Sequence, residues 1–184
     1  KEFIDTIIEM DETYIGGKPR KDNDHHDGEY GNKNGFNKRG RGTNKTPVVG
    51  VIDRLNKIVY AKVAVPDNDG RKLTAKQLFN ILQKVSKPGN KNTIITDEFP
   101  VYKSVTVGQH YHIVINHKQF YMQGDTHTNN IESFWGTLKR GIYWIYHHIS
   151  VEYIQRYVDE FCFRYNNRKN NMFDIVLKQS VYNL

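Results

Sequence analysis

Three acidic residues stand where secondary structure could hold them together. Asp11 interrupts an apolar segment with the pattern of a strand, and Asp97 directly follows another strand-like run at 93–96. Glu132 comes after 34 further residues, at the start of a helical pattern. Carboxylates that a fold gathers repel one another unless a cation joins them. A cluster of these three would therefore indicate a metal site.

The chemistry of such a site follows from its ligands. Carboxylate oxygens suit Mg²⁺ or Mn²⁺, and two such ions about 3.5–4 Å apart stabilise the attacking and leaving oxygens of a phosphodiester. Lys139 follows Glu132 by seven positions, which is two helical turns, so both lie on one helix face. The opposite stripe carries Ile131, Phe134 and Leu138 and can pack on a sheet. These residues favour metal-dependent phosphodiester chemistry.

The composition agrees with a polyanionic partner. The chain has 184 residues, with 27 Lys and Arg against 20 Asp and Glu and a formal net charge of +7. Hydrophobic residues make up 38%, which is too many for a disordered chain, and no apolar run approaches the ~18–20 residues that span a bilayer. The single cysteine, Cys162, excludes an internal disulfide and a cysteine-based zinc site. We expect one domain over residues 1–184, nucleic acid as its partner and no membrane contact.

The elements that must position the acids follow in the order three strands, helix, strand, short helix, strand, helices. Strands are expected at 4–15, 48–52, 58–65, 93–96 and 111–115. Thr74 and Gln77 form a capping box at the start of the first helix, whose apolar period runs on to Val85. Two further helices carry the apolar stripes at 131–142 and 154–165, the second with Ser150 as N-cap. This order predicts an α/β fold with a five-stranded mixed sheet flanked by helices, as in the ribonuclease H-like fold.

A basic segment separates the first two strands. Residues 18–46 hold eight Lys and Arg against four Asp and Glu, with almost no aliphatic side chain. We expect a flexible basic loop in which Arg39 and Arg41 neutralise DNA phosphates. A solvated loop without a role is the alternative.

Five segments carry a family resemblance: DETYIGGK at 11–18, TDE at 96–98, HTNNIESFW at 127–135, LKRG at 138–141 and RYNNR at 164–168. In this order they resemble motifs of the DDE transposases from bacterial insertion sequences related to Merlin elements. The resemblance covers nearly the whole chain. It implies a ribonuclease H-like catalytic domain that cuts transposon ends and joins them to target DNA.

The resemblance also implies roles for single residues. Asp11, Asp97 and Glu132 match the catalytic acids that bind metal, with two Mg²⁺ or Mn²⁺ ions per active site. Lys139 matches the basic residue that is common after the third acid. The remaining candidates for DNA binding are Arg140, Arg39, Arg41 and His148. Three residues near the third acid are candidates to hydrogen-bond the metal-binding carboxylates, or, for the two asparagines, to share the third ligand position: Asn129, Asn130 and His127.

The expected partner is double-stranded DNA, both transposon ends and target, with a homodimer in the synaptic complex. The expected location is the cytoplasm of a prokaryote, on the nucleoid. No DNA-binding region is recognisable before the first strand, so we expect the catalytic core without its N-terminal DNA-binding region. Two other hypotheses stay open: a ribonuclease H-like nuclease that never joins strands, and an inactive domesticated DNA-binding module.

Overall fold

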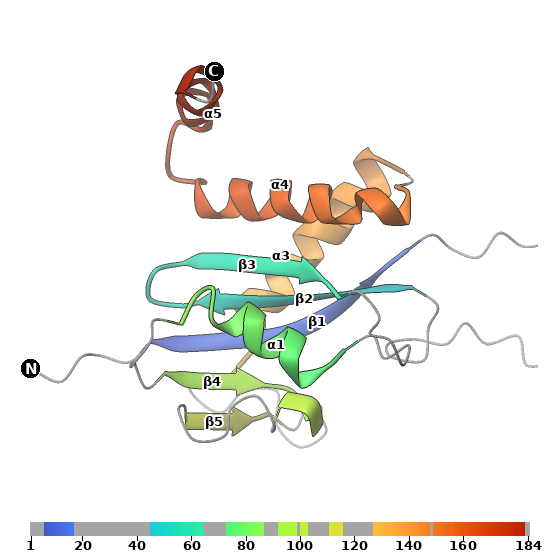
Figure 1. The fold of residues 1–184 in the computed structure, drawn as a ribbon, viewed down its shortest axis with the longest axis vertical. Coiled ribbons are helices and arrows are strands. Elements are labelled where there is room, and N and C mark those ends of the chain that lie inside the picture. Colours follow the sequence, from blue (N-terminus) through green and yellow to red (C-terminus); the bar gives the residue numbers. More distant parts are fainter. Residues whose placement is uncertain are drawn as a thin grey trace, which may run out of the picture.

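The computed structural model describes residues 6–16, 45–64, 73–86, 92–98, 100–102, 111–115, 127–147 and 149–182. Its strands are β1 (Ile7–Ile15), β2 (Thr46–Asp53), β3 (Ile58–Val63), β4 (Thr93–Thr96) and β5 (Tyr111–Val114). Its α-helices are α1 (Ala75–Leu82), α3 (Asn129–Arg140), α4 (Ile154–Asn166) and α5 (Met172–Tyr182). Figure 1 shows the strands as one sheet, with α1 in front of it and α3 behind it.

The sheet has the order β3-β2-β1-β4-β5. Strand β2 is antiparallel to both β1 and β3, whereas β4 is parallel to both β1 and β5. This mixed topology confirms the predicted ribonuclease H-like α/β fold. Because β1 lies at the centre and β4 runs beside it in the same direction, residues at the carboxyl ends of these two strands come to the same edge.

The two faces of the sheet carry separate apolar cores. On one face, Leu78 and Leu82 of α1 pack with Ile8 and Met10 of β1. Successive strand residues point to opposite faces, so the odd-numbered positions of β1 face the other way, and Ile15 joins the second core. The acid Asp11 therefore belongs to the face that α3 covers.

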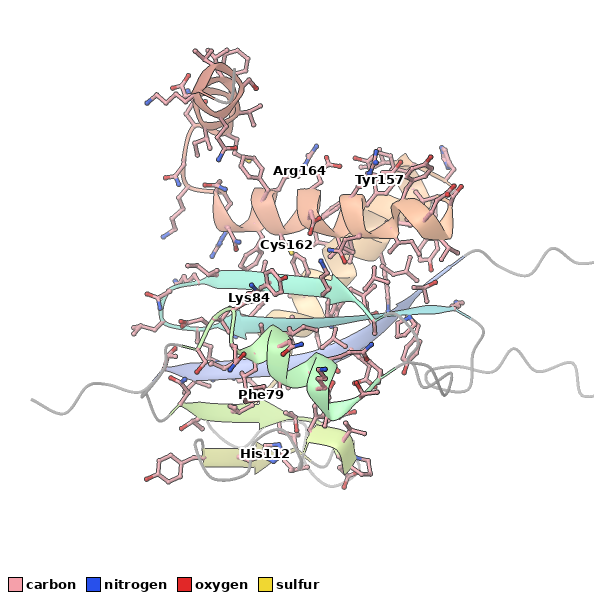
Figure 2. All side chains as sticks on the ribbon, in the orientation of Figure 1. Phe79, Lys84, His112, Tyr157, Cys162 and Arg164 are labelled. Carbon is pink, nitrogen blue, oxygen red and sulfur yellow. The ribbon has the colours of Figure 1, made fainter. Side chains whose placement is uncertain are left out.

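Helices α3 and α4 build the second core. The predicted stripe of α3 is confirmed, because its apolar side chains are almost fully enclosed: Ile131, Phe134, Trp135 and Leu138. Cys162 lies on the side of α4 that faces β3, as Figure 2 shows, while Arg164 points to the outer side. Burial raises the pKa of the Cys162 thiol to about 12, so this cysteine acts as a small hydrophobe, as predicted.

The capping box at the start of α1 is confirmed. The Gln77 backbone N–H donates to Thr74 Oγ1 at 3.4 Å, and the Thr74 N–H donates to Gln77 Oε1 at 3.1 Å. The helix ends at Leu82, so the predicted helix, which continued to Val85, was too long. Residues 83–85 form turns that bond back to the last helical carbonyls.

The C-terminal helices differ from the prediction at three points. Ser150 makes no side-chain capping bond and precedes a short 3₁₀ turn, Val151–Tyr153, before α4 begins. The helix α3 continues into a π-helical turn, Gly141–Ile145, against which Phe161 packs. A Cβ on Gly141 would lie 2.1 Å from Cζ of that ring, so a larger residue there would have to displace Phe161. The helix α5 was not predicted at all.

Two other expectations concern particular parts of the chain. The predicted basic loop at 18–46 falls mostly outside the described residues, although Thr46 is already the first residue of β2.

Within the described ranges, no helix combines the length and the apolar character that crossing a bilayer requires.

Candidate active site

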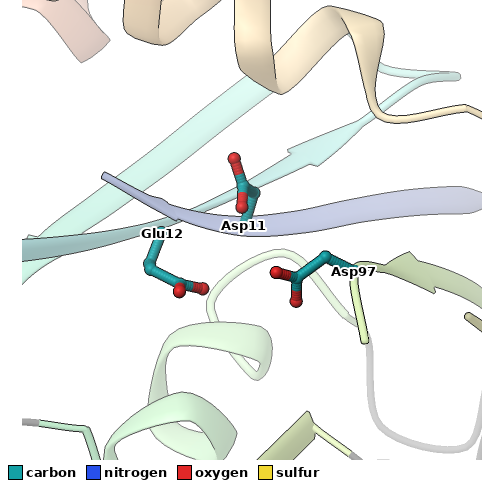
Figure 3. A group of neighbouring side chains, drawn as sticks. All are labelled: Asp11, Glu12 and Asp97. Atoms are coloured by element: carbon teal, nitrogen blue, oxygen red, sulfur yellow. The ribbon is translucent and has the colours of Figure 1, made fainter. Parts of the chain in front are cut away.

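The parallel pairing of β1 and β4 brings two of the predicted acids side by side. The last paired residues are Glu9 and Ile95. Asp11 lies two residues beyond Glu9 and Asp97 lies two residues beyond Ile95, so both stand at the same level of the sheet edge. Ligand oxygens of Asp11, Glu12 and Asp97 all lie within 4.8 Å of one another (Figure 3). We call these three residues the acidic cluster.

Glu12 is the member of the acidic cluster that sequence reasoning missed. Adjacent strand residues point to opposite faces, which argues against a joint site for Asp11 and Glu12. Figure 3 shows the two side chains leaving β1 on opposite sides, yet β1 runs on here beyond its pairing with β4, and both carboxylates reach this edge. The buried Tyr102 hydroxyl donates to Glu12 Oε2 at 2.5 Å and holds that carboxylate in place. The only signal in the sequence was its position next to Asp11.

The electrostatics of the acidic cluster favour a bound cation. Burial raises the pKa of Asp11 to about 8, and the negative charges of Glu12, Asp97 and Glu132 add to this effect, partly offset by a backbone hydrogen bond from Glu12. A nearby positive charge would therefore stabilise the ionised form of the Asp11 carboxyl. Hard oxygen donors at this spacing fit Mg²⁺ or Mn²⁺.

Trp135 of α3 adds a polar contact to this site. Its indole Nε1 donates a hydrogen bond of 3.1 Å to Oδ2 of Asp11. The ring lies over Gly50 of β2, where an added Cβ would come within 2.6 Å of Cη2. The sequence predicted Trp135 as a core residue, which its burial confirms. The bond to Asp11 was not predicted.

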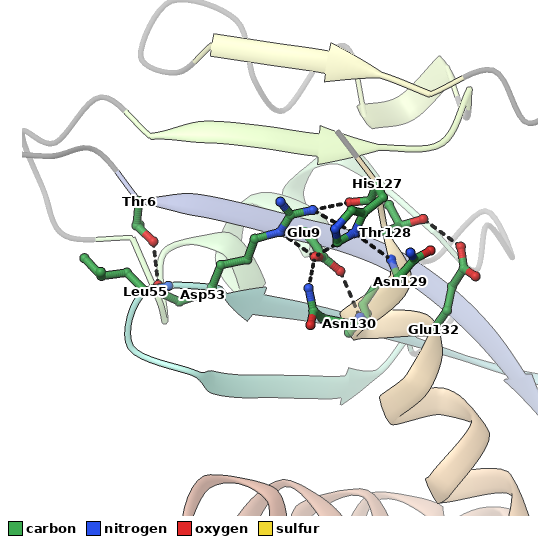
Figure 4. A network of polar contacts seen from close by, with 11 residues as sticks. Thr6, Glu9, Asp53, Leu55, His127, Thr128, Asn129, Asn130 and Glu132 are labelled. Carbon is green, nitrogen blue, oxygen red and sulfur yellow. Dashed lines mark hydrogen bonds and ion pairs between the residues drawn. The ribbon is translucent and has the colours of Figure 1, made fainter. Parts of the chain in front are cut away.

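Glu132 lies near the acidic cluster without joining it. Its side chain is exposed on the first turn of α3, where Thr128 Oγ1 donates to Glu132 Oε1 at 2.7 Å (Figure 4). No oxygen of Glu132 belongs to the group of atoms within 4.8 Å that the described residues form. Its charge is still close enough to raise the pKa of Asp11. The role of Glu132 as third metal ligand stays a prediction.

Positive charge approaches the same site from α3 and from Lys45, the residue before β2. Lys139 is half-buried, and burial lowers the pKa of its ammonium group, with Asp11 opposing and Lys45 adding to this shift. Both of these residues therefore lie near Lys139. Arg140 is exposed, and its Nη2 donates to Thr137 Oγ1 at 3.1 Å. Lys45 belongs to the predicted basic loop at 18–46 but was not singled out as a DNA-binding residue.

The residues predicted to support the carboxylates lie at the start of α3. Asn130 Nδ2 donates to Glu9 Oε1 at 2.5 Å, and the Asn129 backbone N–H donates to His127 Nδ1 at 3.3 Å. His127 Nδ1 lies 3.0 Å from Arg54 Nη2. Of the predicted DNA-binding residues, three lie outside the described part of the chain: Arg39, Arg41 and His148.

In a comparison with known proteins, most of the sequence matches the model of a single domain family. Residues 4–166 match the model of the ISXO2-like transposase domain. No curated protein matches the chain.

Three solved structures resemble the fold at low identity. The catalytic core domain of BIV integrase is 13% identical, over 96% of this chain and 97% of that one, with a TM-score of 0.48. A chain of the simian T-cell lymphotropic virus intasome in complex with PP2A regulatory subunit B56 gamma is 14% identical, over 86% and 47%, also at 0.48. A chain of a pre-cleavage Mos1 transpososome is 15% identical, over 86% and 53%, at 0.37. The chain thus spans about half of the intasome and Mos1 chains. These TM-scores are all below 0.5, so the functional conclusion rests on the family match and the geometry.

Proposed function

The chain belongs to the family of ISXO2-like transposase domains, and we propose that it is the metal-dependent catalytic core of a DDE transposase. In this proposal it hydrolyses a phosphodiester bond at a transposon end and joins the freed end to target DNA. The observation that carries it is the acidic cluster, in which Asp11 and Asp97 from neighbouring parallel strands meet Glu12 within 4.8 Å.

The side chains of the acidic cluster would hold the cation. Asp11 of β1 and Asp97, the residue after β4, each offer an oxygen, and Glu12 offers a third, which Tyr102 orients. Bound Mg²⁺ or Mn²⁺ would polarise the phosphate and activate water. We propose Glu132 as the third catalytic acid of the same site, because its charge is close enough to raise the pKa of Asp11. In this proposal the active site binds two metal ions during the reaction.

The proposed reaction has two displacement steps at phosphorus. In the first, a water oxygen forms the new P–O bond and the strand leaves with a free 3′-hydroxyl. In the second, this hydroxyl oxygen attacks a target phosphodiester, its proton passes to solvent, and the target strand's own 3′-oxygen leaves. Lys139 is proposed to bind a phosphate oxygen during both steps, because it is half-buried and near enough to Asp11 for the two charges to interact.

Double-stranded DNA is the proposed partner. The net charge of +7 and the approach of Lys139 and Lys45 to one site support this proposal. Arg140 next to Lys139 extends the positive charge outward. Arg39, Arg41 and His148 are proposed as further phosphate contacts on the grounds of sequence alone.

A homodimer is proposed because two transposon ends must be joined together. The exposed apolar side chains of α5 support it: Phe173, Val176, Leu177 and Val181. Figure 1 shows α5 standing apart from the sheet and from α4. A helix of 11 residues is marginal in water without packing, and a second copy of the chain would provide that packing. Sedimentation of the whole chain should show a dimer that V176D/L177D converts into a monomer; a monomeric wild type at micromolar concentration would refute it.

A branched oligonucleotide tests the chemistry without knowledge of the transposon end. It carries a free 3′-hydroxyl next to a continuous strand, so an attack by the hydroxyl makes a longer, joined strand, whereas an attack by water makes only shorter ones. With Mn²⁺ the chain should form the joined product, and Asp97→Asn should abolish it. Asp159→Asn, at an exposed position of α4 outside the acidic cluster, is the matched control and should keep full activity. Cleavage without joining would instead indicate the nuclease, and metal-independent DNA binding alone the inactive module.

A further inference from the structure

Glu9 is a fully buried carboxylate outside the acidic cluster. It lies on β1 two residues before Asp11, so both side chains belong to the face that α3 covers. Burying an ionised carboxylate is costly unless charged and hydrogen-bonding partners compensate for its lost hydration. The partners of Glu9 therefore indicate why a charge is kept beneath this helix.

Each oxygen of Glu9 is engaged by groups from elsewhere in the chain (Figure 4). Arg54 Nε donates to Oε1 at 2.6 Å, as does Asn130 Nδ2 at 2.5 Å. The backbone N–H of Ile131 donates to Oε2 at 2.9 Å. His127 contributes as well, with Nδ1 3.8 Å from Oε1 and its backbone carbonyl bound by Arg54 Nη2. The carboxylate thus joins β1, the β2–β3 turn and the first turn of α3.

Glu9 caps the N-terminus of α3 from outside the helix. The first N–H groups of a helix have no partner within the helix, and a polar side chain at the N-cap usually accepts from one of them. The N-cap of α3 is Thr128, but its side chain makes no capping bond and donates to Glu132 instead. Ile131 is the third residue of α3, and its N–H bonds to the strand carboxylate. A negative charge at this position also suits the positive end of the helix dipole.

A second contact joins the same strand to the same helix. Trp135 lies one turn after Ile131 and donates to Asp11, as Ile131 donates to Glu9. Four helical residues rise by about 6 Å, and two strand residues advance by about 7 Å. The two spacings are nearly equal, so α3 is attached to β1 at two points one helical turn apart. Fixing the first point determines where the second one falls.

We propose that Glu9 is a positioning residue, which fixes α3 along β1 and thereby places Trp135 against Asp11, with Glu132 and Lys139 beside the acidic cluster. The consequence for catalysis rests on the proposed function. The consequence for the position of α3 does not.

The indole N–H resonance of Trp135 reports that position directly. The chain has two tryptophans, and Trp144 is 78% exposed, so Trp144→Phe assigns the two signals in a ¹H–¹⁵N spectrum of the whole chain. In Glu9→Gln, one carboxylate oxygen is replaced by an amide NH₂ group, which faces the N–H donors that bind Glu9 and cannot accept from them. We expect the Trp135 signal to shift and its exchange with solvent to speed up at least tenfold, while the Trp144 signal stays unchanged.

A matched variant separates positioning from general loss of stability. Asn166 tethers α4 to β3 through bonds to both the N–H and the carbonyl of Val59. Asn166→Ala should lower the melting temperature as Glu9→Gln does, but it should leave the Trp135 signal in place. If Glu9→Gln fails to fold, Asn130→Ala removes one bond from the same carboxylate at an exposed position and should shift the signal in the same direction by less. A folded Glu9 variant with an unmoved Trp135 signal overturns the proposal, as does an equal shift in Asn166→Ala.

Activity gives a second, separate readout. Asp11 and Asp97 come from β1 and from the residue after β4, so Glu9→Gln should change the Mn²⁺ concentration for half-maximal joining by less than about threefold. The joining rate should fall at least tenfold, because α3 carries Glu132 and Lys139. An unchanged rate in Glu9→Gln counts against the positioning role. Absence of joining in the wild type would refute the proposed function and leave the spectroscopic result standing.

Discussion

The indole nitrogen of Trp135 lies 3.1 Å from Oδ2 of Asp11 and donates a hydrogen bond to it. This bond links the packed stripe of α3 to Asp11, the carboxyl whose pKa burial raises to about 8. The stripe that stabilises the second core therefore also orients a residue of the candidate active site.

Replacing the indole by a phenyl ring tests this link. Trp135→Phe keeps an aromatic ring in the core and removes the N–H donor, so we expect about 1–2 kcal/mol lower stability and about tenfold slower joining. Chemical denaturation and the oligonucleotide assay measure the two effects. Trp144→Phe, at an exposed position, should change neither. Full activity in Trp135→Phe would show that the bond is dispensable.

Gly50 is expected to be indispensable only while Trp135 is present. Gly50→Ala places a Cβ 2.6 Å from Cη2 of the indole, so we expect a loss of about 1–3 kcal/mol through overpacking. Phenylalanine lacks the outer ring, so the same change in a Trp135→Phe background should cost at least 1 kcal/mol less. A double-mutant cycle measures the difference, and additive losses would mean that the indole is not the obstacle.

The contributions of Glu12 and Glu132 can be separated by amide variants. Glu12 belongs to the acidic cluster, so Glu12→Gln should weaken Mn²⁺ binding about tenfold in calorimetry. Glu132 lies outside the cluster, so Glu132→Gln should bind the first ion almost normally, while joining falls more than 100-fold. The opposite pattern, with Glu12 dispensable for binding, would mean that Glu132 moves in to complete the ligand set.

The raised pKa of Asp11 predicts how stability depends on pH. In the folded chain its pKa is about 8, against the ordinary 3.8, so between these values the folded state holds a proton that the unfolded state has lost. Asp11 therefore contributes stability below about pH 4, and this contribution is lost as pH rises through about 8. Melting temperatures of the metal-free chain should fall over this range more steeply than those of Asp11→Asn.

Metal should reverse this trend. A cation competes with the proton for the Asp11 carboxylate, so added Mn²⁺ should raise the melting temperature more at pH 8.5 than at pH 6. Asp97→Asn removes a ligand and should abolish most of the increase. An increase that is equal at both pH values would contradict the coupling between Asp11 and the metal.

Much of the fold was predictable because its signals are local. The β-branched run Thr93–Thr96 gave β4 with its observed bounds, and the capping box at Thr74 located the start of α1. The stripe from Ile131 to Leu138 correctly identified the buried face of α3. The helix α5 was missed because apolar residues such as Met172 and Ile175 also stand outside the stripe of Phe173, Val176, Leu177 and Val181, which weakens its amphipathic period.

The acids were only partly predictable, because their environment is not local. The meeting of Asp11 and Asp97 was predictable because the sequence places one within a strand and the other directly after a strand. Glu12 depends on where β1 loses its β4 neighbour, and Glu9 depends on a helix that begins 120 residues later. Such contacts depend on how elements far apart in the sequence pack together. Periodicity and motif spacing report only local structure and do not predict that packing.

The central claim is that the acidic cluster binds the catalytic metal. Crystals of the chain soaked in Mn²⁺ would show it by anomalous scattering. We predict a peak coordinated by carboxylate oxygens of Asp11 and Asp97, which disappears in Asp97→Asn. An ordered edge of β1 and β4 without a peak there, at Mn²⁺ concentrations that support joining, would contradict the account.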